Sequence, residues 1–193
     1  PQAAERAPWI RAVFPDAPVE FAFAMRNPAT FLPAIHRRFA AEEGFGQFLA
    51  RVAPERLSWL DMVTRLRDSV PDCALTIWAD EDSALLWPDI LQALSGTADP
   101  MALDGVHDFP GTLMQPDGLE RMRTYLETHP PSGPAHRRKV VAAFLDRFAQ
   151  PAAVEMEFDL PGWTAERIAH LTERYEADLA ALARLDGVRL LRP

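Results

Sequence analysis

The sequence predicts an α/β fold that is mostly helical and has a small parallel sheet. Two short apolar runs, residues 19–25 (VEFAFAM) and residues 74–79 (ALTIWA), have the composition of buried strands. Each run is followed by a signal for the start of a helix, and two helical patterns lie between the runs. The order strand, helix, helix, strand, helix is typical of α/β units whose strands are parallel.

The first predicted helix follows the first strand directly. Asn27 is a good N-cap and Pro28 suits the first helical position, so we expect the helix to begin there, with Pro33 bending or delaying it. Gly44-Phe45-Gly46 breaks the helical pattern. A second helix is expected at residues 55–69, where leucine and valine recur at intervals of three until Pro71.

Three acidic residues, Asp80-Glu81-Asp82, follow the second predicted strand. Carboxylates are favoured at the positive end of a helix, so we expect them to cap a helix that begins near Ser83. A divalent cation is the alternative, but adjacent side chains diverge and no histidine is close in sequence. We therefore predict a helix cap and no metal.

The next part of the chain alternates between weak and strong helical signals. Residues 95–116 show no clear periodicity and are expected to form a long surface loop, which in a compact domain suggests function or mobility. Asp117 and Glu120 have capping-box spacing, which predicts a helix beginning at Asp117. After a proline-rich break, the basic run His136-Arg137-Arg138-Lys139 lies in a helix with an apolar stripe, and we expect this run to be a solvated face.

The C-terminal segment has a complete set of helix signals. Pro161-Gly162 and the N-cap Thr164 open a helix that Gly187 ends, and residues 188–191 are expected to form a final short strand. The apolar side of this helix is formed by Ile168, Leu171, Tyr175, Leu179 and Leu182.

Composition limits the function classes. A length of 193 residues favours a single domain, residues 1–193. The net charge is −8 and the basic residues are nineteen arginines and one lysine, which disfavours a broad surface for nucleic acid. The single cysteine, Cys73, excludes an internal disulfide, and no apolar run or signal-peptide pattern indicates a membrane. We expect a cytoplasmic protein without nucleic-acid or membrane partners.

Arg26 stands where the first predicted strand passes into its helix. The N–H groups of the first helical turn would face the same space as the guanidinium, and the Thr30 hydroxyl could add a donor, so an anion could bind there. The carboxyl end of a strand is also where ligands bind in open α/β sheets. The alternative is an ion pair with a carboxylate such as Glu81, and the residues alone favour this alternative.

Familiar catalytic motifs are absent from the sequence. It contains no G-x-x-x-x-G-K-[ST], G-x-G-x-x-G, G-x-S-x-G or H-E-x-x-H. The five histidines show no metal-ligand spacing.

Three segments, in order along the chain, resemble a known family. Residues 19–39 (VEFAFAMRNPATFLPAIHRRF) resemble the region of P-loop sulfotransferases in which a strand ends in Arg-Asn-Pro or Arg-Asp-Pro and passes into a helix. Residues 74–91 (ALTIWADEDSALLWPDIL) resemble their later strand, Glu-Asp pair and helix, and residues 160–193 resemble the closing helix of bacterial sulfotransferase-like proteins. The resemblance implies a truncated P-loop NTPase-like fold, the C-terminal portion of a sulfotransferase-like domain.

The resemblance also implies a cofactor and a parent activity. In that family the arginine contacts the 3′-phosphate of 3′-phosphoadenosine 5′-phosphosulfate, from which a sulfuryl group passes to a hydroxyl or amine. We therefore expect Arg26, Asn27 and Thr30 to bind this nucleotide, with no metal. A serine usually stands eight residues after the arginine; here that position is Ala34, and Thr30 is the residue that could compensate.

The expected activity of the chain alone is limited. The family's phosphosulfate-binding loop precedes the Arg-Asn-Pro strand, and eighteen residues precede that strand here. We expect this chain to be inactive by itself, and no catalytic residue is named. One alternative is a non-catalytic protein that binds a nucleotide, a sulfated ligand or a protein partner on the same scaffold. Another is a helical domain in which Arg26 forms a structural ion pair.

Overall fold

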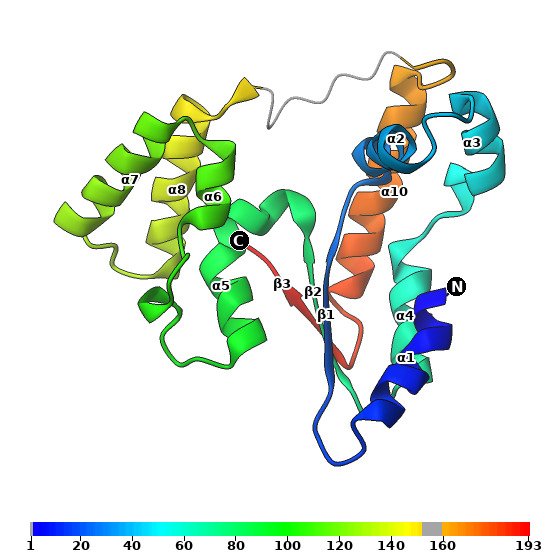
Figure 1. Cartoon of the computed structure of the whole chain (residues 1–193), viewed down its shortest axis with the longest axis horizontal. Coiled ribbons are helices and arrows are strands. Elements are labelled where there is room, and N and C mark those ends of the chain that lie inside the picture. Colours follow the sequence, from blue (N-terminus) through cyan, green and yellow to red (C-terminus); the bar gives the residue numbers. More distant parts are fainter. Residues whose placement is uncertain (1, 152–159) are drawn as a thin grey trace. The chain divides into compact units, whose positions relative to one another are not determined.

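The computed structural model describes residues 2–151 and 160–193 (Figure 1). These residues form an α/β structure that is mostly helical and has one small parallel sheet, as the sequence predicts. Cα packing groups them into two compact units. The first unit comprises residues 2–80 and 160–190, the second unit comprises residues 81–151 and 191–193, and each is described by itself.

Three strands form the sheet, in the order β1 (Glu20–Met25), β2 (Ala74–Ala79) and β3 (Val188–Leu191). β1 and β2 are parallel, and their register pairs Glu20 with Ala74 and Met25 with Ala79. All three strands lie where the apolar runs predict them. Because Met25 and Ala79 are paired, the chain leaves both strands at the same edge of the sheet.

Five α-helices and one 3-10 helix belong to the first unit. α1 packs against α4, and α10 packs against both α2 and α4. Their bounds are α1 (Gln2–Val13), α2 (Pro28–Phe39), α3 (Phe45–Val52), the 3-10 helix η1 (Pro54–Arg56), α4 (Trp59–Ser69) and α10 (Ala165–Leu182).

The core of the first unit lies between the sheet and two helices, α4 and α10, which lie on the same side of the strands in Figure 1. Alternate strand residues pack against these helices, since successive side chains of a strand point to opposite faces. The buried members include Met25, Leu75, Ile77, Val63, Leu66, Tyr175 and Leu182. A second apolar cluster joins α2, α3 and α10 through Leu32, Phe45, Phe48, Trp163 and Leu171.

The second unit is helical. α7 packs against α8, and α5 packs against α6 and α8, around a core that includes Met114, Met122 and Val141. The 3-10 turn η2 (Asp80–Asp82) begins at the last residue of this part of the first unit and leads into the second. The elements of the second unit are then α5 (Ser83–Ser95), the 3-10 helix η3 (Pro100–Ala102), α6 (Asp108–Leu113), α7 (Pro116–Thr128) and α8 (Pro134–Phe148).

The prediction of an unbroken loop at residues 95–116 is wrong. This range contains η3 and α6, and its backbone is held by Trp87 on α5. The indole Nε1 donates a hydrogen bond to the Gly105 carbonyl at 3.0 Å, and the indole ring stacks on Phe109 with centroids 5.1 Å apart. Such short elements have too few turns to show a periodic pattern, and contacts with α5 stabilise them.

Other local predictions need smaller corrections. α7 begins at Pro116 after the N-cap Gln115, so Asp117 lies inside the first turn and is not the cap. Asp82 occupies the N-cap position of α5, but its side chain makes no capping hydrogen bond with the described residues. The sequence predicts neither α1 nor α3. It predicts no element before residue 19, where α1 lies, and it predicts a break at Gly44-Phe45-Gly46, where α3 begins.

Candidate functional site

Arg26, Asn27 and Thr30 lie together at the junction of β1 and α2. Arg26 follows the last residue of β1, Asn27 is the N-cap of α2, and Thr30 lies in its first turn. Arg26 Nε donates to Thr30 Oγ1 at 3.3 Å, and the Thr30 hydroxyl donates to the Asn27 carbonyl at 3.2 Å. The structure thus brings together the three residues that the sequence selects.

Asn27 satisfies the first turn of α2. Its Oδ1 accepts the Ala29 N–H at 2.9 Å, and its carbonyl accepts the N–H groups of Thr30 at 3.0 Å and Phe31 at 2.9 Å. Pro28 has no N–H group to donate. The free helix N–H donors that the sequence suggests for an anion therefore already have acceptors in Asn27, and the Arg26 guanidinium is left as the main cationic group at this position.

An ion pair joins the ends of β1 and β2. Arg26 Nε lies 3.9 Å from Asp80 Oδ2, and the two side chains are 30% and 38% exposed. The strand register explains this contact, since Arg26 and Asp80 each follow a member of the Met25–Ala79 pair. The distance is long for a charge-assisted hydrogen bond, and a partly exposed pair contributes only about 0–1 kcal/mol to stability. Asp80 is thus a carboxylate partner of the kind that the ion-pair alternative requires.

A pocket of about 460 Å³ lies beside the start of α2, and Pro28, two residues after Arg26, is one of its lining residues. The Phe31 and Trp59 rings line it with centroids 6.5 Å apart, and the Trp59 indole Nε1 donates to the Arg26 carbonyl at 3.0 Å. Its other lining residues are Val52, Arg56, Leu57, Ser58, Asp61, Met62 and Arg65. The sequence does not predict this pocket, although Trp59 and Met62 are apolar residues at helical spacing outside the row of leucine and valine expected in this helix.

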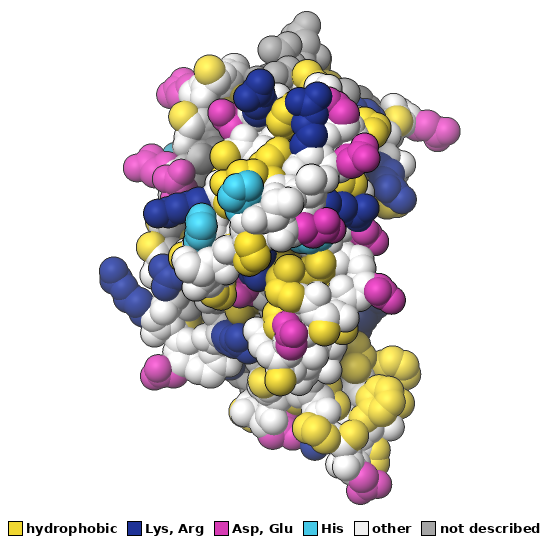
Figure 2. Space-filling view, turned by 90° about the vertical axis from the view of Figure 1, so that its left-hand side faces the viewer, with side chains coloured by type: hydrophobic (Ala, Val, Ile, Leu, Met, Phe, Trp, Pro, Cys, Tyr) yellow, Lys and Arg dark blue, Asp and Glu magenta, His cyan; other side chains and the backbone are white. Residues whose placement is uncertain are grey.

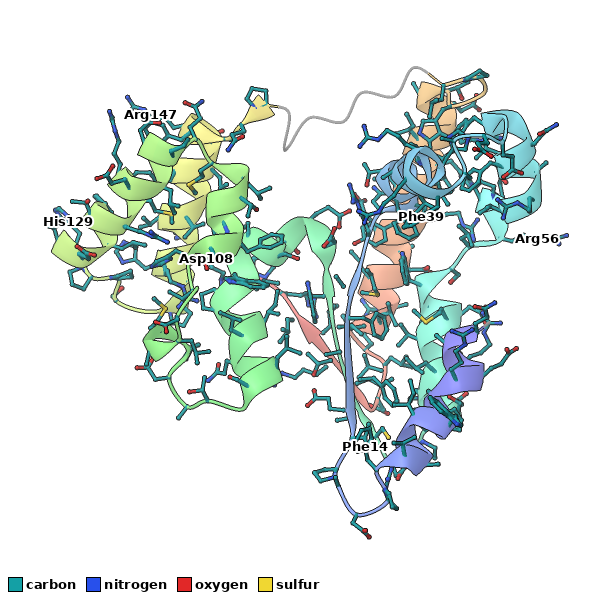
Figure 3. The ribbon with its side chains drawn as sticks, viewed as in Figure 1. Phe14, Phe39, Arg56, Asp108, His129 and Arg147 are labelled. Atoms are coloured by element: carbon teal, nitrogen blue, oxygen red, sulfur yellow. The ribbon has the colours of Figure 1, made fainter. Side chains whose placement is uncertain are left out.

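Two arginines contribute charge to this pocket. Arg65 forms an ion pair with Asp61 at 2.8 Å. Arg56 is exposed and extends outward from the first unit (Figure 3). The lining therefore combines two aromatic rings with two arginines and one aspartate.

Asp178 of α10 holds the N-terminus of α4 beside this pocket. Its Oδ2 accepts the backbone N–H groups of Trp59 at 2.6 Å and Leu60 at 3.3 Å, and it accepts the Ser58 hydroxyl at 3.0 Å. Ser58 in turn accepts the Asp61 N–H as the N-cap of α4. Trp59 is thus fixed through its backbone by Asp178 and through its indole by Arg26.

Among the residues in the two described ranges, no group of three or more His, Cys, Asp or Glu side chains is placed to hold a metal ion. Within those same ranges, every helix is too short or too polar to cross a membrane. Figure 2 shows basic and acidic side chains intermixed on one face of the molecule, where they produce no extended field of one sign.

Comparisons with protein-family models, with curated proteins and with solved structures found no match to this chain.

Proposed function

We propose that this chain is the nucleotide-binding part of a sulfotransferase-like protein with a P-loop NTPase-like fold, and that Arg26 binds the 3′-phosphate of 3′-phosphoadenosine 5′-phosphosulfate or of its product. The observation that carries the proposal is a partly exposed arginine, Arg26, at the carboxyl ends of two parallel strands; its backbone carbonyl accepts a hydrogen bond from Trp59, which lines a pocket with aromatic walls. Ligands of open α/β sheets bind at this end of the strands.

A phosphate at Arg26 would share the guanidinium with Asp80, whose contact is long and partly exposed. A phosphate monoester carries up to two negative charges and can accept two parallel hydrogen bonds from one arginine. The Thr30 hydroxyl accepts a hydrogen bond from Arg26 Nε. In this proposal Thr30 therefore orients the guanidinium that binds the phosphate.

The pocket suits the base of a nucleotide. Its volume of about 460 Å³ lies within the range of about 300–1,000 Å³ that small-molecule sites occupy. Phe31 and Trp59 offer ring faces on which a planar base can stack. Asp178 accepts the Trp59 backbone N–H and the Arg26 carbonyl accepts its indole N–H, so the Trp59 wall of the pocket is in place before a ligand binds.

The proposal assigns binding and names no catalytic residue. Sulfuryl transfer needs donors aimed at the leaving phosphate and a base for the acceptor hydroxyl or amine. The one lysine of the sequence, Lys139, lies on α8 in the second unit, and Ala34 stands where the family has a serine. These two residues favour the non-catalytic alternative, a binding protein on this scaffold.

Calorimetric titration with adenosine 3′,5′-bisphosphate tests the role of Arg26. We expect saturable binding by the wild type and a loss of about tenfold to a hundredfold in affinity for Arg26→Ala, because a hydrogen bond to a charged group contributes about 1.5–3 kcal/mol. Arg37→Ala is the control, since Arg37 is an exposed arginine on α2, the helix that follows Arg26. Equal affinities for wild type and Arg26→Ala, or no binding by either, would overturn the proposal.

A second variant tests the base pocket separately. Phe31→Leu removes one ring and keeps the wall apolar, so it should weaken the nucleotide several-fold, since stacking on an aromatic side chain contributes about 1–3 kcal/mol per base. Binding of inorganic phosphate should not change. If Phe31→Leu leaves nucleotide affinity intact, the base does not bind against this ring.

A further inference from the structure

A second cationic cluster lies in the second unit, on α8. The sequence predicts that the basic run at residues 136–139 is solvated, but Arg137 is only 7% exposed, so that prediction is wrong for this residue. Arg137 Nη2 lies 3.3 Å from Asp89 Oδ2 on α5, and Arg138 Nη1 lies 3.4 Å from the same oxygen. Two guanidiniums therefore share one carboxylate.

The Arg137 guanidinium is incompletely satisfied by the described residues. It has five N–H donors, and its acceptors are Asp89 and the Met101 sulfur, which lies 3.2 Å from Nη1. A thioether is a weak acceptor, and 3.3 Å is long for a charge-assisted bond. Burial lowers the pKa of Arg137, Asp89 opposes this effect and Arg138 adds to it. The carboxylate thus compensates the buried cation only in part.

A cavity of about 370 Å³ opens onto this guanidinium. Its walls come from α5, from η3 and from the start of α8, and they include Asp89, Gln92, Pro100, Met101, Gly133 and Arg137. The volume is sufficient for a small metabolite. Arg137 is the cationic residue in the lining, and Asp89, which it already contacts, is the acidic one.

The first turn of α8 supplies further positive potential to the cavity. α8 has fifteen residues, and its N-cap is Gly133, which has no side chain to cap the helix. Pro134 occupies the first helical position, so Ala135 and His136 carry the next backbone N–H groups. This helix end adds positive potential to a lining in which Arg137 and Asp89 carry one charge each.

We propose that this cavity binds a small molecule through an oxyanion group, a carboxylate or a phosphate, which pairs with Arg137 and the first turn of α8. The site is independent of Arg26 and of the nucleotide proposal. The oxyanion adds a second charged acceptor, besides Asp89, for the Arg137 guanidinium, and Arg138, which contacts the same Asp89 oxygen, adds positive charge nearby.

Amide NMR with inorganic phosphate and, separately, with acetate tests the site at constant ionic strength set by chloride. We expect saturable shifts of the Ala135 and His136 amides with at least one of the two anions. Arg138→Gln should weaken binding about tenfold, and Asp89→Asn should tighten it, because the first removes a positive charge and the second removes the competing negative one. Arg147→Gln, an exposed change on the same helix, is the control.

These two variants keep Arg137 in place, so neither removes the buried side chain itself. Saturation by phosphate alone, by acetate alone or by both supports the site and identifies the preferred group. Absence of saturable shifts with both anions overturns it. So does equal affinity of wild type, Arg138→Gln and Asp89→Asn, which is the result expected if the three residues only tie α5 to α8.

Discussion

Asn27 connects the start of α2 to α10. Its side-chain oxygen caps α2, its carbonyl accepts two further N–H groups of that helix, and its Nδ2 donates to Thr172 on α10 at 3.0 Å. This residue was predicted to bind the nucleotide together with Arg26. These hydrogen bonds of Asn27 go to protein groups, and its binding to the nucleotide stays a prediction.

Asp178 is a comparable residue on α10, and its hydrogen bonds can be tested directly. Asp178→Asn removes the negative charge that the N-terminus of α4 binds and leaves one oxygen to accept from Trp59, Leu60 and Ser58. We expect a loss of about 1–3 kcal/mol in the free energy of unfolding, measured by urea denaturation. Glu176→Gln, an exposed change on the same helix, should have almost no effect. A loss as small as that of the control would show that the bonds from Asp178 do not stabilise the N-terminus of α4.

At the scale of elements, the pair α7 and α8 depends on one close approach. Gly118 is buried in α7, and a Cβ atom there would lie 2.4 Å from Phe148 Cβ on α8. Phe148 cannot relieve this contact by rotating its ring, because its Cβ is attached to the backbone. The contact therefore explains why α7 carries a glycine in its first turn, where helix propensity would favour alanine.

The same substitution should have opposite effects in two helices. Gly118→Ala should destabilise the protein by about 1–3 kcal/mol, because the added methyl group forces α7 and α8 apart. Gly46→Ala in α3 should stabilise it by about 0.5–1 kcal/mol, because nothing lies within 4 Å of the new Cβ and alanine is the better helix former. Thermal unfolding of both variants measures these changes. Stabilisation by Gly118→Ala would contradict the packing of α7 on α8.

Helix α1 shows why some elements escaped prediction. Ala7 is its buried residue, whereas Trp9 and Val13 are 71% and 53% exposed, and Pro8 interrupts the sequence signal. A helix without an apolar stripe shows no periodicity. Its position depends instead on packing against α4 and on the bond from Arg11 to Asp72 at 2.9 Å, which a local pattern cannot reveal.

At the scale of the whole molecule, the two compact units have separate apolar clusters. One cluster joins the sheet to α4 and α10, and another joins α7 and α8. Cooperative opening often follows such units. The chain was expected to be a single domain, and the packing indicates that this domain has two parts with cores of their own.

Hydrogen exchange can separate the two units in the intact chain. Asp178→Asn should lower amide protection in α4 and leave α7 unchanged, whereas Gly118→Ala should lower protection in α7 and leave α4 unchanged. Each change acts on one core, so its effect should remain in that unit. Equal loss of protection in both helices after either change would mean that the chain opens as one cooperative unit.

The sequence by itself determined the class of the fold and the first candidate site. The strands β1 and β2, the start of α2 and the final strand follow from apolar runs, an Asn-Pro pair and glycine, which act over a few residues. The same local signals place Arg26 at the end of β1.

Only the tertiary structure decided which of these groups have partners. The Asp178 bond to Trp59 joins residues 119 positions apart, and the Asp89 pair with Arg137 joins residues 48 positions apart. Burial of Arg137, the aromatic pocket at Trp59 and the Arg26–Asp80 contact all depend on such long-range packing. A periodic pattern shows which face of a helix is apolar, but it does not show which charged residue the neighbouring helix will cover.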